Sequence, residues 1–143
     1  MDAILVATDG SPCAGLAVDF AIDLARDARA TLHVVSVRPS AKLVREGTAV
    51  LVVEDEHAGE DVARAVAEQA AAAGLTAEAH TAEGGAADAI VDLAHRLGVD
   101  MIVVGSRGHG PLVSRIVGSV SRKVVLHSPI PVTVVHGAEV PAS

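Results

Sequence analysis

Short apolar runs alternate along the chain with longer segments in which apolar residues recur at helical spacing. Each short run is rich in Val, Ile, Leu or Ala and ends near Gly, Pro, Asp or Ser, a pattern that predicts a β-strand. The run at 76–81 alternates only weakly but is also predicted as a strand. The five predicted strands are Ala3–Thr8, Thr31–Val37, Thr76–Thr81, Asp100–Val104 and Pro131–Val135.

The longer segments predict helices, and their ends carry the expected signals. Ser11 is a good N-cap and Pro12 suits the first helical position. Gly74 and Gly98 stand where two of the helices should stop. The four predicted helices run from Pro12 to about Ala28, from Glu60 to Ala73, from Ala86 to Leu97 and from Ser119 to about His127.

Strands that alternate with helices predict an α/β fold with a mainly parallel sheet and helices on both faces. At 143 residues the chain makes one domain of ordinary size. The less regular stretch Arg38–His57 interrupts the alternation. Its run Ala49–Val53 predicts either a short strand or a flap over a site.

The fourth predicted strand leads directly into a glycine-rich stretch, Gly105-Ser106-Arg107-Gly108-His109-Gly110. Gly118-Ser119-Val120-Ser121 then opens the last helix, whose free N–H groups and positive dipole end suit an anion. Between Asp100 and Glu139 the chain has no acidic residue, although it contains Arg107, Arg115, Arg122 and Lys123 there. A glycine loop, a helix N-terminus and a local positive charge together predict a phosphate site.

Composition excludes several classes of function. The net charge is −7 and the chain has one Phe and no Trp or Tyr, which argues against a nucleic-acid partner. No apolar run has the length of a membrane span, and the chain enters a strand without a signal peptide, so we expect neither membrane insertion nor secretion. A single cysteine, which cannot form an internal disulfide, fits a cytoplasmic location.

The spacing Gly105-x2-Gly108-x9-Gly118-Ser119 resembles the nucleotide-binding signature of the universal stress protein family, in its ATP-binding branch. Ala7-Thr8-Asp9-Gly10-Ser11 resembles the first-strand motif of that family, and Pro129-Ile130-Pro131-Val132 its closing motif. Gly84–Ile90 also matches, with Ala86 where a proline is common. The resemblance covers nearly the whole chain. It implies a single Rossmann-like domain over residues 1–143, with a five-stranded parallel sheet in the order 3-2-1-4-5.

The same resemblance implies an ATP site, together with Mg²⁺, at the carboxyl ends of the strands. Gly105 and Gly108 would approach the ribose and phosphates. The phosphates would accept hydrogen bonds from backbone and hydroxyl groups of the segment that opens the last helix. Its residues are Gly118, Ser119, Val120 and Ser121. Arg107 and His109 either add positive charge or remain solvated loop residues.

The first two strands complete the implied site. Ala7, Thr8 and Asp9 end the first strand, where Asp9 either assists a divalent ion or the ribose, or caps nearby N–H groups. Val37 ends the second strand, where the family's backbone contacts the adenine edge; its side chain alone predicts a core residue.

Other kinds of site have less support in the sequence. There is no GxxxxGK[ST] motif for a P-loop and no GxGxxG after the first strand. The seven histidines show no ligand spacing, so no metal site is predicted. Cys13 falls in the first turn of a helix, where a thiolate would be stabilised, but a small packed residue is the simpler interpretation.

We therefore predict a nucleotide-dependent sensor or switch of the stress response, with no catalytic residue assigned. One alternative is a slow ATPase or autophosphorylating protein, with Ser119 or Ser121 as acceptor. Another is a receptor for a different adenine nucleotide, such as cyclic AMP or AMP. The resemblance also implies a homodimer in which the last strand pairs with the same strand of a second copy, through Val132 and Val134. An exposed apolar edge strand favours such pairing.

Overall fold

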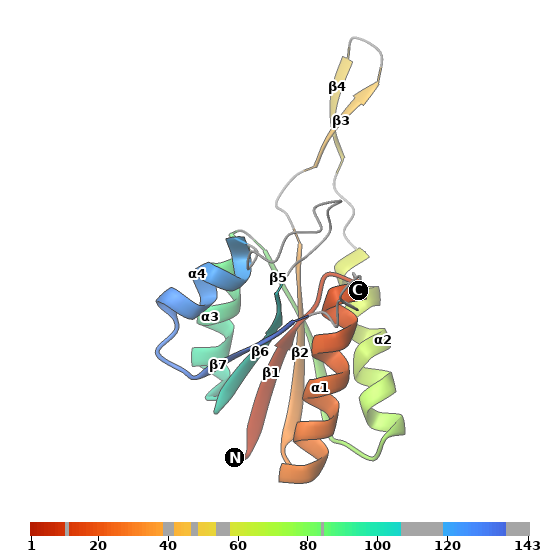
Figure 1. Cartoon of the computed structure of the whole chain (residues 1–143). Coiled ribbons are helices and arrows are strands. Elements are labelled where there is room, and N and C mark those ends of the chain that lie inside the picture. Colours follow the sequence, from red (N-terminus) through yellow and green to blue (C-terminus); the bar gives the residue numbers. More distant parts are fainter. Residues whose placement is uncertain are drawn as a thin grey trace, which may run out of the picture.

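The computed structural model describes residues 1–10, 12–38, 42–46, 49–53, 58–83, 85–106 and 119–136. Its main sheet has five parallel strands in the spatial order β5-β2-β1-β6-β7 (Figure 1). The strands are β1 (Ala3–Ala7), β2 (Thr31–Arg38), β5 (Ala77–Glu83), β6 (Met101–Gly105) and β7 (Val132–Val135). Numbered along the chain, this order is 3-2-1-4-5, so the predicted fold class and strand order are confirmed.

Four helices cover the two faces of this sheet (Figure 1). One face packs against α1 (Pro12–Ala28) and α2 (Ala58–Ala72), and the other against α3 (Ala86–Leu97) and α4 (Ser119–His127). Because both faces are covered, the central strands are apolar almost throughout, as the sequence indicated. Ile4, Leu5, Val6 and Ile102 are fully buried.

The two layers of the core differ in the size of their side chains. The α1/α2 layer contains Ala17, Ala21, Ala25, Ala63 and Ala70, all fully buried. Small side chains let both helices approach the sheet closely. The α3/α4 layer has fewer buried alanines, Ala87 and Ala94, and packs three larger helical side chains on the strands. They are Ile90, Leu93 and Val124.

Between β2 and α2, the chain forms a two-stranded antiparallel sheet that the sequence predicted only in part. β3 (Lys42–Glu46) pairs with β4 (Ala49–Val53), with Val44 opposite Leu51. The run 49–53 is therefore a strand, whereas the charged run 42–46 gave no strand signal. Figure 1 shows this hairpin beyond the carboxyl end of the main sheet.

Tight connections join the helices to the following strands at the amino end of the sheet. Arg29, Gly74 and Gly98 each adopt positive φ there, at 55°, 90° and 66°. Glycine takes this left-handed conformation at no steric cost, which explains why the two glycines stop their helices. The Asp100 carboxylate accepts hydrogen bonds from the N–H groups of Asp2 and Ala3, at 2.7 and 3.1 Å. These contacts tie the start of β6 to the start of β1.

Candidate functional site

The sheet has its topological switch point between β1 and β6. From β1 the chain passes to β2 and β5 on one side, and it returns to β6 and β7 on the other. Ligands of open α/β sheets bind at the carboxyl ends of the strands at such a point. Thr8 and Asp9 follow β1 and Gly105 ends β6, so the fold brings these predicted residues to this place.

Serine 121 joins the start of α4 to the end of β6. Its side chain is buried, and its hydroxyl donates a hydrogen bond to the carbonyl oxygen of Gly105. Ser119 and Val120, the first two residues of α4, are exposed. The first N–H groups of an α-helix have no acceptor within the helix. The hydrogen bond therefore holds a helix N-terminus at the end of β6.

This geometry changes the expectation for the two serines. The Ser121 hydroxyl is engaged with the backbone of β6, so its most direct role is to position α4. Its backbone N–H remains at the N-terminus of the helix, as predicted. Ser119 is exposed, and of the two candidate phosphoryl acceptors it is the accessible one.

Gly105 is held in close contact with the start of α1. A Cβ atom at this position would lie 3.1 Å from the carbonyl oxygen of Cys13 and 3.4 Å from its Sγ. The neighbouring Ser106 Oγ lies 3.6 Å from the same sulfur. Packing of β6 against α1 therefore disfavours a larger residue here, in addition to any approach of a ligand. Cys13 is half-buried in this contact, in line with the interpretation of a small packed residue.

At the end of β1, local hydrogen bonds account for the buried threonine. The Thr8 N–H donates to the carbonyl oxygen of Val35 at 2.9 Å, and Thr8 Oγ1 accepts from the Gly10 N–H at 3.2 Å. Gly10 has φ +80°, which turns the chain from β1 toward α1. Asp9 stands exposed at this turn.

Two further predicted residues occupy the α3/α4 layer. Ala7 and Val37 are half-buried and pack against its core, so the side chain of Val37 is a core residue, as its sequence suggested. Four predicted site residues lie outside the described residues: Arg107, Gly108, His109 and Gly118. The structure thus brings Gly105 and Ser121 together, and it places Thr8 and Asp9 at the end of the adjacent strand.

A groove of about 460 Å³ opens beside this place, between α1 and α2. Among the predicted site residues that the structure describes, Thr8 alone lines it. The remaining lining comes from the turn after β1 and the two helices, including Leu16, Val62 and Gln69. The groove therefore adjoins the end of β1 but lies on the α1/α2 side of the sheet, away from Ser121.

One group of side chains was missed by the sequence analysis. His33 on β2 lies close to Glu78 and His80 on β5, and we refer to the three as the His33–Glu78–His80 cluster. The two histidines show no ligand spacing along the chain, since 47 positions separate them, but the sheet brings their ring nitrogens within 3.0 Å. The only sequence signal is Glu78-x-His80, whose alternation puts both side chains on one face of a strand.

The sequence profile of the universal stress protein family matches residues 1–136. The chain belongs to the universal stress protein family. A curated relative, the universal stress protein YxiE of Bacillus subtilis, is 35% identical over an alignment that covers 92% of this chain and 97% of the relative.

Two solved structures of universal stress proteins share the fold and contain nucleotides. One, a complex with cAMP, has a TM-score of 0.72 and 28% identity, and covers 94% of this chain and 96% of its own. The other, from Archaeoglobus fulgidus in complex with dAMP, has a TM-score of 0.72 and 26% identity, and covers 94% of this chain and 98% of its own. Members of this family with the same architecture therefore bind adenine nucleotides.

Among the residues that the structure describes, no helix combines the length and hydrophobicity that crossing a membrane would need.

Proposed function

We propose that this universal stress protein binds ATP, together with Mg²⁺, at the carboxyl ends of β1 and β6 and acts as a nucleotide-dependent switch of the stress response. The observation that carries the proposal is the N-terminus of α4, which Ser121 fixes at the end of β6 through its bond to Gly105. A helix N-terminus offers N–H donors and a partial positive charge to phosphate oxygens.

Two other observations support the same site. Arg122 and Lys123 are exposed on the first turns of α4, within the acid-free segment of the chain. The two structural relatives with bound cAMP and dAMP support an adenine nucleotide as the ligand. We choose ATP because the spacing Gly105-x2-Gly108-x9-Gly118-Ser119 resembles the signature of the ATP-binding branch of the family.

Mass spectrometry of the nucleotide released from freshly purified protein tests the identity of the ligand. We expect ATP as the main species. A competition series of ATP, AMP and cyclic AMP against a fluorescent adenine nucleotide then ranks the candidates. If cyclic AMP displaces the probe at lower concentration than ATP does, the protein is a receptor for the cyclic nucleotide instead.

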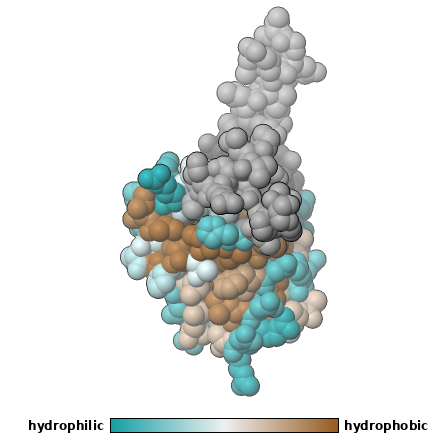
Figure 2. All heavy atoms as spheres, in the orientation of Figure 1, coloured by the Kyte–Doolittle hydropathy of each residue, from teal (hydrophilic) through white to brown (hydrophobic). Residues whose placement is uncertain are grey.

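The proposal includes a cytoplasmic homodimer formed through β7, an edge strand of the sheet. All four residues of β7 are half-buried, and Figure 2 shows hydrophobic residues gathered at this edge, between α4 and α1. The carbonyl groups of Pro131 and Val135 accept hydrogen bonds from the N–H groups of Ile102, on β6, and Ser106, just after it. Because backbone groups alternate in direction along a strand, the N–H of Val134 points to the free edge, where a second copy can pair.

A proline in place of Val134 removes this donor at the free edge. We expect Val134→Pro to be folded but monomeric by light scattering. Thr133→Pro is the matched control, because its N–H faces β6 and its loss lowers the melting temperature instead. If folded Val134→Pro has the dimer affinity of the wild type, self-association uses another surface.

A further inference from the structure

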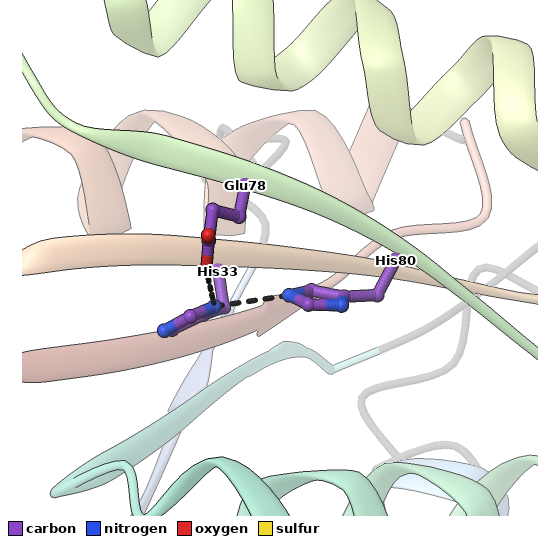
Figure 3. Close-up of side chains that lie close together, drawn as sticks. All are labelled: His33, Glu78 and His80. Carbon is purple, nitrogen blue, oxygen red and sulfur yellow. Dashed lines mark hydrogen bonds and ion pairs between the residues drawn. The ribbon is translucent and has the colours of Figure 1, made fainter.

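The His33–Glu78–His80 cluster lies on a different part of the sheet from the nucleotide site. Its residues come from the edge strand β5 and from β2 beside it, where His33 pairs with Glu78 and Val35 with His80. All three side chains project from the same face of the sheet and point toward one another (Figure 3). His33 is four residues before Val37, so it lies about 13 Å back along its strand from the proposed nucleotide contact.

The three potential ligand atoms already lie close together. His33 Nδ1 is 3.0 Å from His80 Nε2 and 3.2 Å from a carboxylate oxygen of Glu78, and all three atoms fall within 4.8 Å of one another. Tetrahedral zinc with bonds of about 2.0 to 2.2 Å holds its ligand atoms about 3.3 to 3.6 Å apart. Small rotations of the side chains would bring the distances between the three potential ligand atoms to that spacing.

Hydrogen bonding among the three side chains is incomplete. His33 Nδ1 faces both the Glu78 oxygen and His80 Nε2. If Nδ1 carries a proton, two acceptors share it; if it does not, the carboxylate faces a lone pair. A cation at the centre would satisfy all three atoms at once, because each then contributes one lone pair.

The surroundings of His80 favour its neutral imidazole. Burial, followed by the nearby His33, lowers the pKa of His80, and Arg96 on α3 lowers it further while Glu78 opposes the shift. A neutral imidazole is the form that ligates a metal.

We propose that His33, Glu78 and His80 bind a divalent transition-metal ion, with zinc as the ion that fits best. Two imidazoles and one carboxylate are a common zinc donor set, and three protein ligands leave a fourth position for water. The His33 side chain is only 9% exposed whereas that of Glu78 is 59% exposed, so the ion would enter from the side of Glu78.

The bound ion would link the edge strand β5 to its neighbour β2. β5 contributes two ligands and is otherwise partly exposed along its length, while β2 contributes the third and belongs to the core. Zinc should therefore slow amide hydrogen exchange in residues 77–83 and raise the melting temperature. Since the cluster shares no residue with the nucleotide site, zinc and ATP should bind independently.

Calorimetric titration of ZnCl₂ into untagged, chelator-treated, nucleotide-free protein tests the proposal. We expect one zinc per chain for the wild type, and loss of a ligand in His80→Gln should weaken binding by more than about 100-fold, beyond what loss of an outer-shell partner costs. Glu78→Gln should weaken binding as well and is the safer variant, since its side chain is largely exposed. His127→Gln, which changes an exposed histidine on α4, is the matched control and should bind as the wild type does.

The chain has seven histidines, so the variants decide where zinc binds. Equal zinc affinity in wild type, folded His80→Gln and Glu78→Gln would overturn the proposal, as would a wild type that takes up no zinc. Absorption of the Co²⁺ form gives a second measurement: visible bands of a four- or five-coordinate ion should be present in wild type and His127→Gln and lost in His80→Gln.

Discussion

The two ends of the main sheet are built differently. At the amino end, tight turns with positive-φ residues such as Gly98 join helices to strands. Hydrogen bonds to the Asp100 carboxylate connect the starts of two strands there. At the carboxyl end, the connections after β2 and β6 are long, spanning 39–57 and 106–118. Loops on a rigid scaffold are where binding residues collect. We therefore expect substitutions at the amino end to change the stability of the fold, and substitutions at the carboxyl end to change ligand binding.

Glycine variants at the two ends of the sheet should distinguish an effect on ATP binding from an effect on stability most clearly. Gly118→Ala, or Gly108→Val, should abolish ATP binding with little change in melting temperature, because a Cβ blocks the close approach of phosphate to the backbone. Gly98→Ala is the control at the amino end. It should cost about 1 to 2 kcal/mol of stability, since φ is +66° there, and leave ATP affinity unchanged.

For these three variants, calorimetry measures the ATP affinity and chemical denaturation measures the stability. Unchanged ATP affinity in folded Gly118→Ala would remove the glycine loop as the binding site. A loss of ATP affinity in Gly98→Ala would mean that the two ends are not functionally separate.

Gly105→Ala should lower both the stability of the fold and the affinity for ATP, because Gly105 packs against α1 and also belongs to the proposed nucleotide site. The new Cβ would meet the Cys13 carbonyl oxygen at 3.1 Å, and overpacking of this kind costs about 1 to 3 kcal/mol. Urea denaturation should show the loss in the absence of any nucleotide. Wild-type stability in this variant would show that β6 and α1 can move apart freely, and Gly105 would then be required only by the ligand.

The smallest expected effect is a pH-dependent change in melting temperature from a substitution of Asp100 at the amino end. Hydrogen bonds from the N–H groups of Asp2 and Ala3 lower the pKa of Asp100 below its ordinary value of 3.8. The folded state therefore favours the carboxylate, and the stability it adds is present above the ordinary pKa and lost as the pH falls through the lowered one. Asp100→Asn should melt below the wild type at pH 7, and the difference should shrink at about pH 3. A constant difference at both pH values would contradict an ionic role for Asp100.

Much of the fold could be predicted from the sequence, because local signals and the fold agree. Apolar runs gave four of the five strands of the main sheet, weak alternation gave the fifth at 76–81, and glycines such as Gly74 marked helix ends where a left-handed residue is required. The strand 42–46 was missed because its sequence, Lys-Leu-Val-Arg-Glu, has no alternation of apolar and polar residues, and because it pairs only with the nearby strand 49–53.

The sites were harder to predict, since they depend on contacts between distant segments. The packing role of Gly105 depends on Cys13, and the cluster of His33 and His80 depends on the register of two strands. No spacing along the chain encodes such a register. Ser121 was chosen as a phosphate donor from the motif, whereas its hydroxyl bond to Gly105 is a tertiary contact that fixes the helix.

Titration of Mg²⁺-ATP into nucleotide-free protein, followed by calorimetry and by the melting temperature, tests the proposed function most directly. We expect saturable binding of one ATP per chain, with stabilisation of roughly 2.7 kcal/mol at about 100 times the dissociation constant. Binding should disappear in Gly118→Ala. A wild-type protein that shows neither heat of binding nor a melting shift at millimolar ATP would contradict an ATP site at the carboxyl ends of β1 and β6.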